Sequence, residues 1–269
     1  MNGHRLPMQH GPDPASWPKR GYGRSVCAVI LACLLAAVMT ACVGDRTATV
    51  VSPGSAAQPG PAATTSQFQQ WLNEYQVPFA VPQRGRGILV NIPAFELIAF
   101  EDGEPVLRSR IIVGSANNPT PVLETHTTAV RFRPTWRPTP DMVRTGEYRD
   151  RIWPPGLGNP LGLLAIRLEP GLLVYLHDTN QRQLFDEPER ALSHGCIRVE
   201  RWDALAAWVL DLDLGTIHAW ANGRRTFDMR TPYLPVFLGY YTAFPDDAGE
   251  LKHFVDVYGL EANESDSPE

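Results

Sequence analysis

Prolines and glycines recur so often in this chain that long helices are disfavoured over most of its length. The 269 residues include 25 prolines and 22 glycines. Proline removes a backbone hydrogen-bond donor and glycine favours turns, so their frequent occurrence favours short strands joined by turns. A hydrophobic share of 43% is ordinary for a globular protein and can supply a core. We therefore expect a mainly β domain with a few short helices.

The order of apolar segments predicts where these elements lie. A turn at Asp102-Gly103 joins the second and third strands of an antiparallel meander. The predicted strands are residues 88–92, 95–100, 106–113, 126–136, 161–167, 172–177, 235–241 and 253–258, and the predicted helices are residues 67–75 and 201–210. Residues 137–158 contain four prolines and no sustained period. Because so long an insertion is uncommon in a compact domain, we interpret it as a functional lid.

The N-terminal segment predicts export. Lys19, Arg20 and Arg24 precede an apolar run at 26–39, and this arrangement is typical of a signal peptide. The run is short for a transmembrane helix. The residues up to Cys42 also approximate a bacterial lipobox, although leucine is usual at the position of Met39. We expect residues 1–42 to be a signal for the cell envelope or periplasm, with lipidation at Cys42; ordinary cleavage nearby and an uncleaved anchor are the alternatives.

The remaining boundaries follow from composition and charge. Residues 43–86 are expected to be a flexible linker with a short N-terminal extension, residues 87–260 the main domain, and residues 261–269 an acidic disordered tail. The formal net charge of −5 argues against a nucleic-acid partner, which would require a basic surface.

The segment 193–198, Ser-His-Gly-Cys-Ile-Arg, contains the most chemically suggestive residue. Cys196 is expected to be the only thiol of the mature protein, because the other cysteines lie at positions 27, 33 and 42. A lone thiol in an exported chain cannot form an internal disulfide. If it has a role, that role is reactivity.

Two histidines can activate this thiol. His194 is close in sequence, whereas His177 ends a predicted strand and can face Cys196 from a neighbouring one. A backbone carbonyl or the Asp178 carboxylate can fix the tautomer of His177. The N–H groups of Gly195 and Cys196 can form an oxyanion hole. Spacing alone does not decide between the histidines.

Each of these residues also has an ordinary structural interpretation. A lone cysteine is commonly a small buried apolar residue, and His177 can be purely structural. A zinc site of His177, His194 and Cys196 lacks a convincing fourth ligand. Arg198 can neutralise a substrate carboxylate or simply pair with Glu200.

Residues 175–178, Tyr-Leu-His-Asp, followed by residues 193–200 resemble the active-site signature of the L,D-transpeptidases, the YkuD-domain family. The similarity covers roughly residues 87–260. Further segments resemble the branch typified by the murein transpeptidase YcbB: residues 90–94, 112–114, 120–122, 156–162 and 235–258.

The resemblance implies a fold of curved antiparallel sheets, sandwich-like, with few short helices and a lid insertion, and it implies no cofactor and no metal. It makes Cys196 the nucleophile and His177 the proton acceptor and donor, oriented through the carbonyl of Asp178. It also implies an oxyanion hole and substrate pocket shaped by Ser193, His194, Gly195 and Arg198.

The implied reaction is acyl transfer on peptidoglycan. In that family the cysteine attacks the third residue of a tetrapeptide stem, D-alanine leaves, and an amine resolves the thioester to give a 3→3 cross-link. With water as acceptor the same intermediate gives an L,D-carboxypeptidase, and with a lipoprotein lysine it gives an anchoring enzyme. The non-enzymatic alternative is a degenerate wall-binding module.

Overall fold

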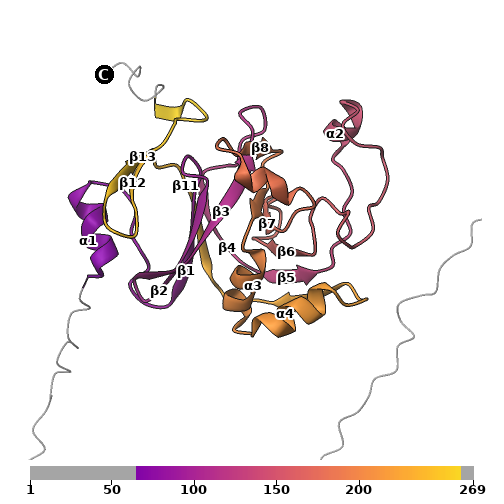
Figure 1. Cartoon of the computed structure of the whole chain (residues 1–269), viewed down its shortest axis with the longest axis horizontal. Coiled ribbons are helices and arrows are strands. Elements are labelled where there is room, and N and C mark those ends of the chain that lie inside the picture. The colour runs from indigo at the N-terminus through magenta and orange to yellow at the C-terminus, as the bar shows by residue number, and fades with distance from the viewer. Residues whose placement is uncertain (1–64, 262–269) are drawn as a thin grey trace, which may run out of the picture. The chain divides into compact units, whose positions relative to one another are not determined.

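The computed structural model describes residues 65–261, and Figure 1 shows their strands as a curled sheet flanked by short helices. The strands are β1 (Arg86–Asn91), β2 (Glu96–Glu101), β3 (Glu104–Gly114), β4 (Leu123–His126), β5 (Ala129–Phe132), β6 (Leu164–Arg167), β7 (Tyr175–His177), β8 (Ala191–Ser193), β9 (Ile197–Val199), β10 (Phe227–Arg230), β11 (Pro235–Gly239), β12 (Ala243–Pro245) and β13 (Leu251–His253). The helices are α1 (Gln67–Glu74), α2 (Pro140–Arg144), the 3₁₀ helix η2 (Arg182–Asp186), α3 (Trp202–Leu210) and α4 (Leu214–Ala221). The prediction of a mainly β fold with few short helices is confirmed.

Within the described residues, eleven strands form one sheet and β12 pairs with β13 separately. The sheet order is β10-β5-β6-β7-β9-β3-β2-β1-β11-β4, and β8 pairs with β3. Most pairs are antiparallel, including the predicted meander β1–β2–β3 and the hairpin β6–β7. The pairs β1–β11, β7–β9 and β3–β8 are parallel. Parallel neighbours come from segments far apart in sequence, so local periodicity did not reveal them.

Two predicted strands differ in the structure. The expected strand at 126–136 is reduced to β5, which covers residues 129–132 and pairs with β6 and β10, while residue 126 ends β4, which pairs with β11. Thr127 lies at the break, where its N–H donates to the Leu234 carbonyl. The expected strand at 253–258 is also wrong, because β13 ends at His253. Helices α2, η2 and α4 and strands β8, β9, β10 and β12 were not predicted.

Strands β1 and β2 are buried on both faces, which explains why they read as continuous apolar runs. One face belongs to the main core, which also receives β3, β6, β7, β9 and helices α3 and α4. The other face contributes to a second core with helix α1 and the residues that follow it. The first face carries Ile88, Val90, Leu97 and Ala99, and the second carries Leu89, Ile98 and Phe100.

Helix α1 is therefore packed against the sheet. Ser66 caps its N-terminus by accepting a hydrogen bond from the Gln69 N–H at 3.2 Å. Phe68 and Leu72 are fully buried, and the Phe68 ring centroid lies 5.4 Å from that of Phe100. Residues 65–86 are thus structured, while the rest of the expected linker lies outside the described residues.

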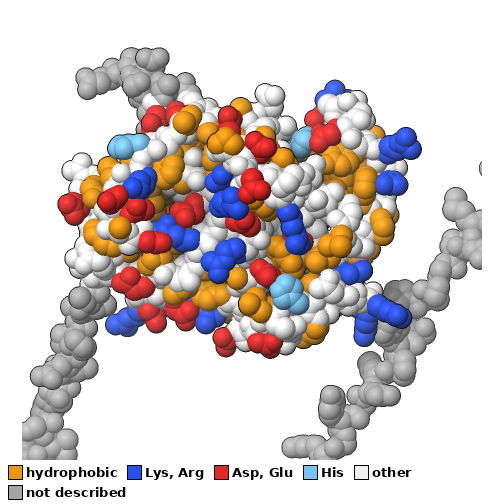
Figure 2. Space-filling model, in the orientation of Figure 1, with side chains coloured by type: hydrophobic (Ala, Val, Ile, Leu, Met, Phe, Trp, Pro, Cys, Tyr) orange, Lys and Arg blue, Asp and Glu red, His pale blue; other side chains and the backbone are white. Residues whose placement is uncertain are grey.

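The surface carries mixed charge over the face drawn in Figure 2, where Lys and Arg side chains are interspersed with Asp and Glu. No helix within residues 65–261 is both long and apolar enough to cross a membrane. The expected signal at 1–42 and all but the first residue of the expected tail at 261–269 lie outside the described residues.

Removing the Phe68 ring should destabilise the domain. We expect Phe68→Ala to lower the free energy of unfolding by about 3–5 kcal/mol, because it opens a cavity between α1 and β2. Urea unfolding followed by circular dichroism measures this change. Glu74→Ala, at an exposed position of the same helix, is the matched control and should change stability by less than about 0.5 kcal/mol. Equal stability of the two variants would contradict the packing of α1.

Candidate active site

The two halves of the predicted signature meet at the parallel pair of β7 and β9. Leu176 lies opposite Ile197, and His177 lies opposite Arg198. Cys196 immediately precedes β9, so in this parallel register it lies beside Tyr175 at the start of β7, two residues before His177. Cys196 and His177 line the same cleft.

The ring of His177 is oriented by the backbone. Its Nδ1 atom contacts the carbonyl oxygen of Asp178. A carbonyl only accepts, so Nδ1 carries the proton and Nε2 remains an acceptor. His177 is only 4% exposed. This arrangement is the one the family resemblance implied for Asp178.

The carboxylate of Asp178 has a separate, structural set of contacts. It accepts hydrogen bonds from the Leu163 N–H at 2.9 Å and from Arg182 at 3.0 and 3.2 Å. Gly162 packs so closely against it that a Cβ there would lie 2.3 Å from the Asp178 Oδ2 atom. The buried carboxylate therefore joins the end of β7 to the turn before β6 and to η2.

The loop that carries Cys196 is held by its own hydrogen bonds. Ser193 Oγ donates to the Cys196 carbonyl at 2.5 Å and accepts from the Gly195 N–H at 3.1 Å. Gly195 has a φ of 98°, which a residue with a Cβ rarely adopts. Because the Gly195 N–H donates to Ser193 Oγ, this hydrogen bond would have to break before the N–H could donate to an oxyanion.

A second layer supports this loop from behind. Thr120 Oγ1 donates to the Gly195 carbonyl at 3.0 Å and accepts from the Gly114 N–H at 2.9 Å. The Tyr258 hydroxyl donates to the Gly114 carbonyl at 2.7 Å and accepts from the Thr120 N–H at 3.1 Å. Thr120 and Tyr258 were not predicted as site residues, although both fall in segments that carried the family resemblance.

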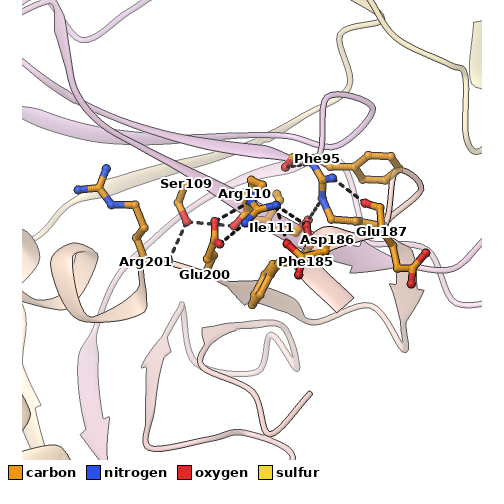
Figure 3. Close-up of polar contacts among 10 residues, drawn as sticks. Phe95, Ser109, Arg110, Ile111, Phe185, Asp186, Glu187, Glu200 and Arg201 are labelled. Atoms are coloured by element: carbon orange, nitrogen blue, oxygen red, sulfur yellow. Dashed lines mark hydrogen bonds and ion pairs between the residues drawn. The ribbon is translucent and has the colours of Figure 1, made fainter. Parts of the chain in front are cut away.

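An arginine clamp fixes the segment between the histidine and the cysteine (Figure 3). Arg110 of β3 makes two hydrogen bonds to the Glu200 carboxylate, at 2.8 and 2.5 Å, and also contacts the Phe185 carbonyl and Asp186 in η2. The Glu200 carboxylate raises the pKa of Arg110. Glu200 is thus paired with Arg110, and the alternative pairing of Arg198 with Glu200 is wrong.

Arg198 instead extends along the cleft. Its Nη1 donates to the Gln181 side chain at 2.7 Å. Burial lowers the pKa of Arg198, while Tyr148, Cys196 and Glu147 oppose that shift. A guanidinium held in a partly buried cleft by a neutral amide is suited to a carboxylate of a ligand.

Burial sets the protonation of the thiol and the imidazole. Burial raises the pKa of Cys196 above its ordinary value of about 9, against the opposing effects of the Tyr175 N–H and Arg198. Burial and then the positive charge of Arg198 lower the pKa of His177 to about 3, against the Asp178 carbonyl. At neutral pH both groups are therefore uncharged, and a thiolate–imidazolium pair is not the resting state.

The cleft around these residues has a volume of about 350 Å³. It brings together five predicted residues, His177, Ser193, His194, Cys196 and Arg198. Asp178 and Gly195 do not line it. The lining residues that sequence reasoning missed include Arg131, Trp136, Tyr148, Arg167 and Tyr175. For Arg131 and Arg167 the only sequence signal is alternation along β5 and β6, and it does not indicate which face meets the cleft. Tyr175 lies in the segment that resembles the family signature, and Tyr148 lies in the predicted lid.

Residues 137–158, predicted to be a lid, form a wall of this cleft through Arg137, Thr139, Met142 and Tyr148, and their role as a lid stays a prediction. The backbones of Trp136 and Trp153 exchange two hydrogen bonds, at 3.1 and 2.7 Å, which close the insertion at its base. The Tyr148 ring packs against both tryptophans, with centroids 4.8 and 6.1 Å away. The insertion is not structureless, because it contains α2.

Comparison with known proteins identifies the family. Residues 85–233 match the YkuD family, described as the L,D-transpeptidase catalytic domain. That match covers more than half of the chain, so the protein belongs to this family.

The chain is similar to a candidate L,D-transpeptidase of Haemophilus influenzae, with 28% identity over 67% of this chain and 46% of the relative. It is 35% identical to the candidate L,D-transpeptidase ErfK/SrfK of Escherichia coli over 44% of this chain and 38% of the relative. The chain thus spans about half the length, or less, of these curated relatives. A solved L,D-transpeptidase of Mycobacterium smegmatis aligns with a TM-score of 0.36 and 19% identity, over 57% of this chain and 58% of that one.

The protonation state of Cys196 is testable by alkylation. Because the pKa of the thiol is raised, we expect iodoacetamide to modify Cys196 more slowly than free cysteine at pH 7. The rate should rise about tenfold for each pH unit until above pH 9. Peptide mass spectrometry follows this residue separately from the other cysteines. Fast alkylation that is constant between pH 5 and pH 8 would indicate a preformed thiolate and contradict this account.

Proposed function

We propose that this protein is a peptidoglycan L,D-transpeptidase of the bacterial cell envelope and that it acts through a thioester on Cys196. The observation that carries the proposal is the cleft lined by both Cys196 and His177, in a chain that has the family's catalytic domain. A thiol beside an oriented base is the arrangement that nucleophilic acyl transfer needs.

The first half-reaction begins with a neutral thiol and a neutral imidazole. Cys196 Sγ attacks the carbonyl carbon of the third residue in a tetrapeptide stem, while the free Nε2 of His177 takes the thiol proton. The bond to the terminal D-alanine then breaks, and the imidazolium returns the proton to the departing amine. The Cys196 N–H and the polar groups of His194 and the Ser193–Gly195 loop are proposed to stabilise the oxyanion.

The second half-reaction resolves the thioester with an amine. A side-chain amine of another stem attacks the carbonyl, the carbon–sulfur bond breaks, and a 3→3 cross-link forms. Water in place of the amine would give carboxypeptidase activity, and a lipoprotein lysine would give anchoring. All three outcomes share the acyl-enzyme.

The charge of the cleft supports anionic peptide substrates. Arg131, Arg137, Arg167 and Arg198 line it. Arg131 is paired with Asp228 at 2.7 and 2.8 Å, whereas Arg198 hydrogen-bonds the neutral Gln181. We propose that Arg198 binds a carboxylate of the acceptor stem.

Placement in the envelope and the YcbB-like branch are parts of the same proposal. The N-terminal charge and apolar pattern support export, and the lipobox-like residues support lipidation of Cys42. The segments at 112–114 and 120–122 that resemble the branch supply the layer of hydrogen bonds behind Gly195.

Muropeptide analysis tests the reaction. We expect purified protein incubated with disaccharide tetrapeptides to release D-alanine and form 3→3 dimers, and Cys196→Ala to form neither. Liquid chromatography with mass spectrometry measures both products.

Turnover retained in Cys196→Ala would contradict the thioester. Tripeptides without dimers would show that water is the acceptor and would replace the transpeptidase with the carboxypeptidase alternative. Binding of muropeptides without any product would indicate the wall-binding module.

A further inference from the structure

One acidic side chain of the lid contacts the signature itself. Glu147 Oε2 lies 2.9 Å from His194 Nε2, two residues before Cys196. The two side chains are 42% and 31% exposed, so the contact lies at the mouth of the cleft and remains open to solvent. Glu147 follows α2, within the insertion that forms the cleft wall.

The neighbouring acids of this region are already paired with arginines. Asp228 is held by Arg131, with Arg167 at 3.5 Å, and Asp150 is held by Arg137 at 2.9 Å. Glu147 contacts His194 instead, and a neutral histidine does not balance the negative charge of the carboxylate. The residues lining the cleft in the described part of the chain include four arginines and no Asp or Glu.

The other groups that face Glu147 define what it can bind. Tyr148 is the adjacent lid residue, and burial followed by the charge of Glu147 raises the pKa of its hydroxyl. Arg198 is also close enough for Glu147 to act on its pKa. A carboxylate and a guanidinium at one cleft mouth complement a zwitterion, that is, an ammonium beside a carboxylate.

We propose that Glu147 binds the ammonium group of the acyl acceptor and selects an amino-acid-type amine over water. The inference rests on the proposed function. It means that a residue of the lid, Glu147, helps to bind the acyl acceptor. A lysine side chain presents an ammonium without a neighbouring carboxylate, so it satisfies Glu147 but not Arg198.

The protons balance in this scheme. The acceptor arrives as R–NH₃⁺ beside Glu147 and gives one proton to His194, so the carboxylate–ammonium pair becomes a carboxylate–imidazolium pair. The neutral amine attacks the thioester carbon, the C–N bond forms, and the C–S electron pair returns to Cys196. The second proton passes from nitrogen through His177 to the sulfur, and His194 later releases its proton to solvent.

The test compares Glu147→Gln with Asp141→Asn. Both variants remove one negative charge from the lid, but Asp141 pairs with Arg144 in α2 and is not part of the proposed site. Each protein is given the same donor tetrapeptide and either a cationic acceptor, free diaminopimelic acid, or a neutral one, hydroxylamine. The measured quantity is the ratio of kcat/KM for the two acceptors, which cancels effects on folding and on donor binding.

We expect Glu147→Gln to lower the cationic-to-neutral ratio by roughly three- to tenfold, since a half-exposed contact is weakened by solvent and salt. Added salt should lower the ratio in wild-type protein and have less effect in the variant. Asp141→Asn should match wild type.

An unchanged ratio in Glu147→Gln, with D-alanine release intact in wild type, would overturn this inference and leave the thioester mechanism standing. An equal loss in both variants would also overturn it, because general lid charge would then be the cause. Absence of D-alanine release from wild type would instead refute the proposed function, and the inference with it.

Discussion

Two backbone pairings, Leu176 with Ile197 and His177 with Arg198, hold β7 and β9 side by side in parallel. All the chemistry proposed for the cleft depends on this pair, since it places Cys196, which immediately precedes β9, beside β7, whose last residue is His177. A parallel pair needs a long connection. Here the connection contains η2 and β8, and the Arg110 clamp fixes it against β3.

Strand β3 is in turn the anchor of that arrangement. It pairs with β2, β8 and β9, so the meander and the loop that carries Cys196 share one strand. Its last residue, Gly114, is hydrogen-bonded to Thr120 and Tyr258, and Thr120 also donates to the Gly195 carbonyl. The meander itself is covered on its outer face by α1. Packing of Phe68 against Phe100 therefore stabilises β2, which pairs with β3. Neither phenylalanine lies near the site.

Much of this organisation could be predicted from local sequence. The meander, the β6–β7 hairpin, α3 and the lid were predicted because apolar runs, turn residues and helical spacing are local signals. The partner switch at Thr127 and the parallel pair of β7 with β9 were not, because they depend on tertiary contacts. In the site, the signature nominated Cys196, His177 and Asp178, but Thr120, Tyr258 and Arg110 act through contacts more than 70 residues away in sequence. Pairing of Arg198 with Glu200 was a reasonable local expectation, and Arg110 displaced it.

The most direct test of the account is covalent trapping of the proposed nucleophile by a carbapenem. Intact-mass measurement over time, followed by peptide mapping, gives both the rate and the modified residue. The account predicts one adduct per chain, on Cys196. It also predicts that His177→Gln lowers the rate of adduct formation by at least about 100-fold, and that His194→Gln lowers it less. An adduct on another residue, or a His177→Gln rate equal to that of wild type, would contradict it.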